Sequence, residues 1–135
     1  PTLTFNTIGR HQSMLVRTRI ASTGSPGCPS AAWATSTPWP SATVRPLRGT
    51  SERAGHLIAN GQITTQYVDQ DGSPSMDMKY NPNGSVLAIE GITSPDGRVF
   101  GKMGHSERSG EYLYKNVTGD KYQPIFEGGV DYFKI

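Results

Sequence analysis

The sequence predicts a β-rich domain of the α/β or α+β class, in which hairpins dominate and one helix lies near the C-terminus. Short runs of β-branched residues alternate with turn sequences rich in Gly, Pro, Asn and Asp. Close to the C-terminus, apolar residues recur at helical spacing instead. With 135 residues the chain is long enough for one domain, although a hydrophobic share of 34% and 16 glycines predict a sparsely filled core.

Two strands are expected near the N-terminus. In Leu3–Thr7 apolar and polar residues alternate, and Met14–Ile20 is rich in β-branched types. Gly9 is expected to turn the chain between them.

Residues 27–55 are expected to be irregular. This segment shows neither helical nor strand periodicity, and prolines such as Pro38 and Pro40 interrupt both structures. Cys28 lies in it without an obvious base nearby in the sequence. Because a thiol needs a positioned partner to become a nucleophile, we do not expect Cys28 to be catalytic.

Two hairpins are predicted after this segment. Gln62–Val68 reads as a strand that begins after an Asn-Gly turn, and the alternating residues 76–80 are expected to return beside it. The apolar run Val86–Ile92 is expected to pair with Val99–Met103 across a Pro-Asp-Gly turn.

A helix is predicted in the last stretch, from Tyr122 to Tyr132. Ile125, Phe126, Val130 and Phe133 are spaced to share one helical face. The adjacent glycines 128 and 129 weaken the helix, so we expect packing to hold it.

His105 and Glu107 are the candidate catalytic residues. They follow the second hairpin, and a carboxylate two residues after a histidine can fix the imidazole tautomer and stabilise its charged form. The pattern is short, and a surface histidine beside a glutamate in an ion pair is the alternative interpretation. Taken alone, the spacing favours the second reading.

Composition argues against several classes of protein. The formal net charge is only +2, so a nucleic-acid partner is not expected. No apolar run approaches the roughly 20 residues of a membrane span, and neither membrane attachment nor a targeting segment is expected. A single cysteine favours a cytoplasmic protein. The chain begins at Pro1 rather than Met, which predicts a piece of a longer protein.

Several longer sequence segments give a more specific indication. They occur in a fixed order: Thr4–Asn6, Gly9–Ser13, Asn60–Ile63, Gln66–Asp69, Asn81–Ser85, Ile89–Ile92 and Gly101–Arg108. In this order they closely resemble the C-terminal glutaminase domain of phosphoribosylformylglycinamidine synthase, a class I glutamine amidotransferase. The resemblance covers residues 1 to about 22 and about 57 to 135.

The resemblance implies a partial flavodoxin-like α/β domain and a set of roles. A cysteine thiolate attacks glutamine, and His105 and Glu107 match the histidine and glutamate of the family's His-Pro-Glu-Arg motif, with Ser106 in place of proline. The ammonia is used by a synthetase domain in the ATP-dependent amidation of formylglycinamide ribonucleotide. The implied partners are glutamine and the remainder of the synthase, and ATP and Mg²⁺ belong to the synthetase domain, with no cofactor in this chain.

The chain departs from the family in two places. The family's Gly-x-Cys-Asn-Gly elbow is absent, so residues 1–135 are expected to be the C-terminal part of one amidotransferase domain that is inactive alone. Residues 27 to about 55 do not match, and we hypothesise that a one-base frameshift is the cause. The typical family sequence Val-Gly-Asp-Val-His-Thr-Val-Ala-Val-Ser-His-Gly-Glu-Gly, when its codons are read from the second base, gives Trp33 to Arg45. The alternative is a non-catalytic binding module that retains the scaffold.

Overall fold

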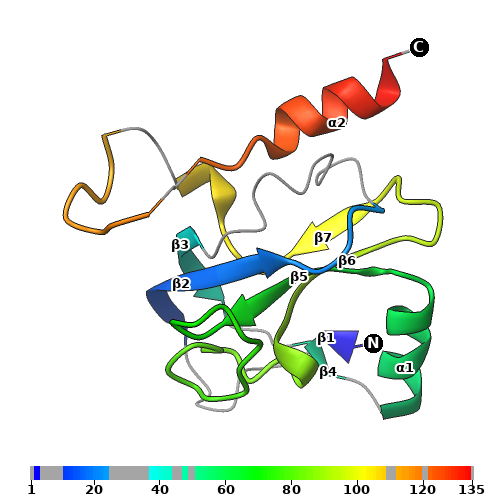
Figure 1. The fold of residues 1–135 in the computed structure, drawn as a ribbon, viewed down its shortest axis with the longest axis horizontal. Coiled ribbons are helices and arrows are strands. Elements are labelled where there is room, and N and C mark those ends of the chain that lie inside the picture. Colours follow the sequence, from blue (N-terminus) through cyan, green and yellow to red (C-terminus); the bar gives the residue numbers. More distant parts are fainter. Residues whose placement is uncertain are drawn as a thin grey trace.

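A five-stranded antiparallel sheet is the centre of the computed structural model (Figure 1). The structure describes residues 2–3, 11–24, 37–43, 47–48, 51–108, 112–119 and 122–134. The strand order is β3-β2-β5-β6-β7, with bounds Thr37–Thr43, Gln12–Ile20, Ile63–Val68, Ile89–Thr93 and Phe100–Lys102. A separate short pair joins β1 (Thr2–Leu3) to β4 (Leu47–Arg48).

The predicted strands β2 and β5 are confirmed, and they pair with each other. Arg17 lies opposite Val68 and Ile20 opposite Thr65. Arg19 lies opposite Gln66 in this ladder, and its guanidinium donates to Gln66 Oε1 at 2.9 and 3.2 Å. Residues 4–10, including the predicted turn at Gly9, lie outside the described residues.

The core consists of two small groups of buried side chains on this sheet. One contains Val16, Tyr67 and Ala88, and the other contains Ile63 and Ile89. Met103 packs against both groups. The residue that precedes the Gly104-His105 segment is therefore anchored in both parts of the core.

The hairpin of β6 and β7 is confirmed, with Gly91 opposite Lys102 and Thr93 opposite Phe100. Its turn contains Gly97, whose φ of +75° is a conformation that favours glycine. The first strand is shorter than predicted, because Val86–Ala88 forms the 3₁₀ turn η2. Leu87 and Ala88 have positive φ angles of 52° and 55°, so extended backbone begins only at Ile89.

Strand β3 corrects the expectation that residues 27–55 are irregular. Seven residues from Thr37 to Thr43 pair with β2, and Leu47–Arg48 pairs with β1. Pro38 and Pro40 are compatible with this because β3 is at the end of the strand order, and prolines two residues apart place their nitrogens on the same edge. Residues 27–36, 44–46, 49 and 50 lie outside the described residues.

Helix α1, Ser51–Ala59, is a second correction to the same segment. Ala54 is buried and Leu57 packs against the Ile63 and Ile89 group. The Asn-Gly pair is a turn, as predicted, but it ends a helix: Gly61 N donates to Ile58 O at 3.0 Å and Gln62 N to Leu57 O at 2.8 Å. With Gly61 at a φ of +63°, these bonds form a Schellman motif.

The predicted hairpin between Gln62–Val68 and residues 76–80 is wrong. Among the described residues, β5 forms no ladder with residues 76–80. An isolated β-bridge between Val68 and Pro74 is the only strand-like pairing in this described region. Asp69 Oδ1 accepts hydrogen bonds from Asp71 N and Ser73 N, and Asp77 O accepts from Tyr80 N and Asn81 N. These local turns replace a second strand, and β5 pairs with β2 and β6 instead.

The C-terminal helix is confirmed as α2, Ile125–Phe133. Its apolar side chains are largely exposed, with Phe126 at 77%, Val130 at 59% and Phe133 at 56%. In Figure 1 the helix extends away from the sheet. The expectation that packing holds this helix is therefore wrong for the described residues. Among the described residues, no helix is long and apolar enough to cross a membrane.

Candidate functional site

The candidate site begins where the β6–β7 ladder ends. Met103 N donates to Glu90 O at 2.9 Å, which is the last backbone bond of this ladder. Gly104 is buried, and His105 follows it directly. Since Met103 is packed in the core, the chain leaves the sheet at a defined point and direction.

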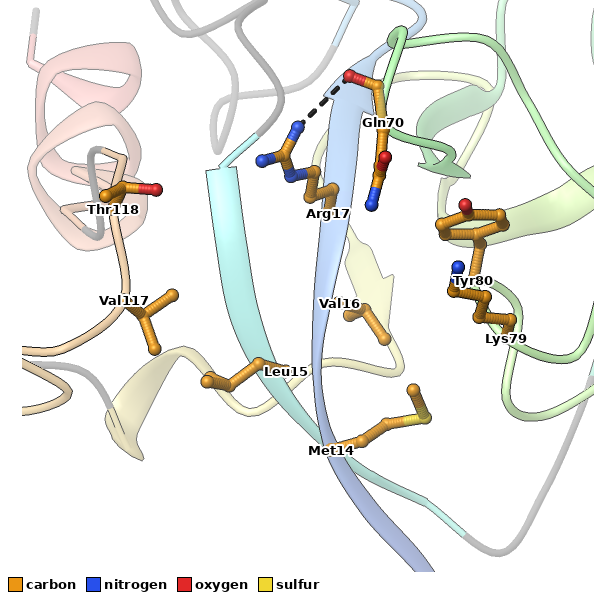
Figure 2. A pocket seen from close by; sticks show the side chains of 9 residues that line it. All are labelled: Met14, Leu15, Val16, Arg17, Gln70, Lys79, Tyr80, Val117 and Thr118. Carbon is orange, nitrogen blue, oxygen red and sulfur yellow. Dashed lines mark hydrogen bonds between the residues drawn. The ribbon is translucent and has the colours of Figure 1, made fainter.

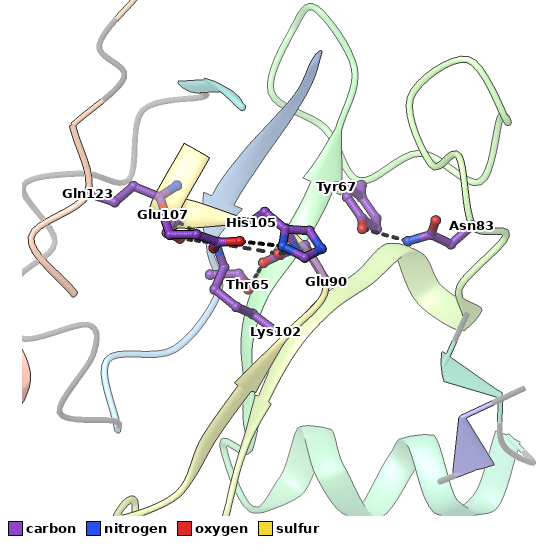
Figure 3. Close-up of polar contacts among 10 residues, drawn as sticks. Thr65, Tyr67, Asn83, Glu90, Lys102, His105, Glu107 and Gln123 are labelled. Carbon is purple, nitrogen blue, oxygen red and sulfur yellow. Dashed lines mark hydrogen bonds and ion pairs between the residues drawn. The ribbon is translucent and has the colours of Figure 1, made fainter. Parts of the chain in front are cut away.

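His105 and Glu107 lie together, as their spacing predicts (Figure 3). Their Nδ1 and Oε1 atoms are 2.5 Å apart. The 3₁₀ turn η3, Ser106–Arg108, folds the glutamate back toward the ring, and Arg108 N donates to His105 O at 3.1 Å. The two side chains are 37% and 63% exposed, so the pair is open to solvent and to a substrate.

The contact decides the protonation pattern of the imidazole. An ionised carboxylate only accepts hydrogen bonds, so Nδ1 carries the proton and the Nε2 lone pair of a neutral ring is available. The hydrogen bond from His105, followed by the backbone N–H of Glu107 itself, lowers the pKa of Glu107. The pair can therefore accept a proton at Nε2 while the carboxylate stays charged.

A buried network adjoins this pair, and the sequence analysis missed it. Glu90 is 2% exposed and accepts hydrogen bonds from Thr65 Oγ1 and Gly104 N. Lys102 lies 3.6 Å from Glu90 and also donates to Ser106 and Gln123. One sequence signal was available: Glu90 is the only charged residue in the apolar run Val86–Ile92.

A cavity of about 340 Å³ lies elsewhere on the sheet (Figure 2). It is lined by Met14, Leu15, Val16, Arg17, Gln70, Lys79, Tyr80, Val117 and Thr118. Neither His105 nor Glu107 is among these residues. Arg17 already donates to Gln70 O at 3.1 Å, and Lys79 lies over the Tyr80 ring, so both cations have partners.

Metal binding and cysteine chemistry are two further possibilities at this site. Within the described parts of the chain, no three His, Cys, Asp or Glu side chains lie together as a metal ion requires. Cys28 lies outside the described residues. The described geometry is thus that of an acid/base pair.

Similarity to known proteins adds to this geometry. The family model of the CobB/CobQ-like glutamine amidotransferase domain matches residues 1–133. The phosphoribosylformylglycinamidine synthase subunit PurQ of Picrophilus torridus is 50% identical over 79 residues, covering 58% of this chain and 31% of the relative. The PurQ subunit of Pyrococcus furiosus is 37% identical over 73 residues, covering 54% and 30%. The chain thus spans less than a third of the length of these relatives.

A solved structure has the same fold. PurLQS from Thermotoga maritima superposes with a TM-score of 0.69 at 21% identity, covering 98% of this chain and 53% of that one. This confirms the predicted fold class, a partial α/β domain of the class I glutamine amidotransferase type. Its described part is an antiparallel sheet with a C-terminal helix. Since the family model spans nearly the whole sequence, the chain belongs to the family of CobB/CobQ-like glutamine amidotransferase domains.

Proposed function

We propose that this chain is the C-terminal part of the glutaminase of phosphoribosylformylglycinamidine synthase. The complete glutaminase hydrolyses glutamine and supplies ammonia for the ATP-dependent amidation of formylglycinamide ribonucleotide in purine biosynthesis. The observation that carries the proposal is the His105–Glu107 contact of 2.5 Å at the end of β7. The PurQ relatives support the choice of this glutaminase among amidotransferases.

In the proposed mechanism His105 handles the proton and Glu107 holds the ring. His105 Nε2 takes the proton of a cysteine thiol, and the thiolate attacks the glutamine carboxamide. The protonated imidazole then gives the proton to the leaving nitrogen, which departs as ammonia and leaves a thioester. Water, activated by the same nitrogen, hydrolyses the thioester to glutamate. Glu107 keeps Nδ1 protonated throughout.

The nucleophile is proposed to come from the part of the domain that precedes the matched region. In the amidotransferase family it lies in a cysteine elbow, which this sequence does not contain. An oriented base without a nucleophile forms no thioester, so residues 1–135 alone are expected to be inactive.

The proposal also places the partners. The remainder of the glutaminase domain and the synthetase are the proposed protein partners, and glutamine is the substrate. ATP and Mg²⁺ are assigned to the synthetase and not to this chain. Purine biosynthesis by this complex implies a cytoplasmic location.

A chimera tests the proposal. The part of the Picrophilus torridus PurQ subunit that precedes its match to this chain is fused ahead of residues 1–135, and glutamate release from glutamine is measured with purified protein. We expect release from the chimera and none from residues 1–135 alone. The intact PurQ subunit is the control. A chimera that is folded by circular dichroism and releases no glutamate would contradict the proposal and favour a non-catalytic module.

A further inference from the structure

Glu90 extends the sheet by one hydrogen bond beyond the backbone ladder. Its carbonyl oxygen accepts from Met103 N at 2.9 Å, and its own carboxylate Oε1 accepts from the next amide, Gly104 N, at 2.6 Å. The same residue thus fixes two successive amides directly after the opposite strand, β7. The second of these amides belongs to the residue directly before His105.

The carboxylate is costly to bury, and its contacts show what compensates the cost. The Glu90 side chain is 0% exposed. Thr65 Oγ1 donates to Oε2 at 2.5 Å, and the Lys102 ammonium lies 3.6 Å from Oε1. Removing an ionised carboxylate from water is unfavourable unless it is hydrogen-bonded and paired. Glu90 meets both conditions, with partners on β5, on β7 and on the segment that leads to His105.

Lys102 connects this carboxylate to Ser106, the residue between His105 and Glu107. Its Nζ donates to Ser106 Oγ at 2.9 Å and to Gln123 Oε1 at 3.1 Å. Ser106 Oγ also donates to Gln123 Oε1 at 3.0 Å. Ser106 lies between His105 and Glu107, so Lys102 holds the middle of the His-x-Glu turn. Figure 3 shows Glu90 and Lys102 beside the His105 and Glu107 side chains.

We propose that Glu90 and Lys102 are positioning residues for the His105–Glu107 pair. The carboxylate fixes the residue before His105, and the ammonium fixes the residue after it. As a role in glutamine hydrolysis, this inference rests on the proposed function. The geometric part of it does not, because it concerns contacts within this chain.

Stability alone does not account for the network. A buried ion pair can often be replaced by well-packed apolar side chains without loss of stability. Here the ladder stops at Met103, and the His105 turn is exposed on its outer side. The buried charges therefore supply the fixed attachment that an exposed turn of a few residues lacks. Such an attachment is what holds a proton-transferring ring in one orientation.

The test uses the 135-residue chain and does not depend on activity. Glu90→Gln removes the charge at constant size, and Lys102→Met removes the ammonium. Glu52→Gln, on the exposed face of α1, is the matched control. The titration of the Glu107 carboxyl is followed by ¹³C NMR, and the His105 tautomer by ¹⁵N NMR. Circular dichroism shows whether each variant is folded. If Glu90→Gln does not fold, Lys102→Met still tests the proposal.

In the wild-type chain we expect a Glu107 pKa below the ordinary value and a single Nδ1–H tautomer. In Glu90→Gln and Lys102→Met the pKa of Glu107 is expected to move back toward the ordinary value, and the ring to populate both tautomers. Glu52→Gln is expected to match the wild type. Folded variants with an unchanged Glu107 titration and His105 tautomer would overturn the proposal.

Kinetics of the active chimera provide the second arm. Misplacement of a reacting group can cost up to about 100-fold in rate, so kcat is expected to fall by about tenfold or more in Glu90→Gln and Lys102→Met while KM stays within about twofold. Equal losses in Glu52→Gln would count against the inference. A chimera that is inactive before mutation would instead contradict the proposed function, and the NMR result would still decide the positioning role.

Discussion

Replacing Gly91 by alanine is expected to lower the free energy of unfolding by about 3 kcal/mol, a sum of overpacking and a displaced buried hydrogen bond. The added Cβ would lie 2.4 Å from Thr65 Oγ1, 2.9 Å from Phe100 Cε2 and 3.1 Å from Thr64 Oγ1. A contact of 2.4 Å forces the Thr65 side chain to move. Thr65 is the residue that donates to the buried Glu90 carboxylate, so the movement also weakens that bond.

Thermal unfolding measures this effect, and Gly101→Ala is its matched control. A loss of this size lowers the midpoint by about 10 °C for a domain of this length. Gly101 lies on the neighbouring strand with nothing within 4 Å of an added Cβ, so its alanine variant is expected to stay within about 0.5 kcal/mol of the wild type. Equal midpoints for the two variants would show that the close packing around Gly91 is not as described.

Replacing His105 by asparagine in the active chimera is expected to reduce glutamine hydrolysis by about 10² to 10⁴-fold, the usual contribution of a positioned acid/base group. Asparagine keeps a polar side chain of similar size but cannot exchange a proton at this position. Glu107→Gln is expected to cause a smaller loss, because the ring remains present and the carboxylate is 63% exposed.

Initial rates of glutamate release measure both variants. His56→Asn is the matched control, since His56 is an exposed histidine in the last turn of α1. It is expected to leave the rate within about twofold, as a surface substitution away from the site does. If His105→Asn retained more than a tenth of the rate, another group would have to carry the proton, and the proposed role of His105 would be wrong.

The local patterns of the sequence predicted the elements whose partners are close in the chain. Alternation and β-branched residues located β2 and β5, and a Pro-Asp-Gly turn located the β6–β7 hairpin. The predicted partner of β5 was wrong because the true neighbours, β2 and β6, are set by packing over long separations. Prolines concealed β3, since their compatibility with a strand depends on its place at an edge.

The sequence predicted the part of the candidate site whose residues are close together in the chain, and not the rest. His105 and Glu107 are two residues apart, so their spacing alone suggested a contact. Glu90, Lys102 and Gln123 come from three separate segments. Their contacts depend on the register of β6 and β7 and on the position of the residues just before α2. A lone carboxylate in an apolar run indicated that Glu90 needs partners, but not which ones.

The pairing of β2 with β5 also has a kinetic consequence. Arg19 and Gln66 meet across this pair although 47 positions separate them, whereas the two strands that carry the candidate site are joined by one short turn. Closing a long loop has a larger entropic cost than closing a short one, and distant pairings form slowly. We therefore expect the β6–β7 hairpin to form early in refolding and β2 to join late, an order that hydrogen exchange during refolding would reveal. Protection of β2 amides before those of β6 would reverse it. In the expected order, the segment that holds His105 acquires its shape before the sheet that buries Glu90 is complete.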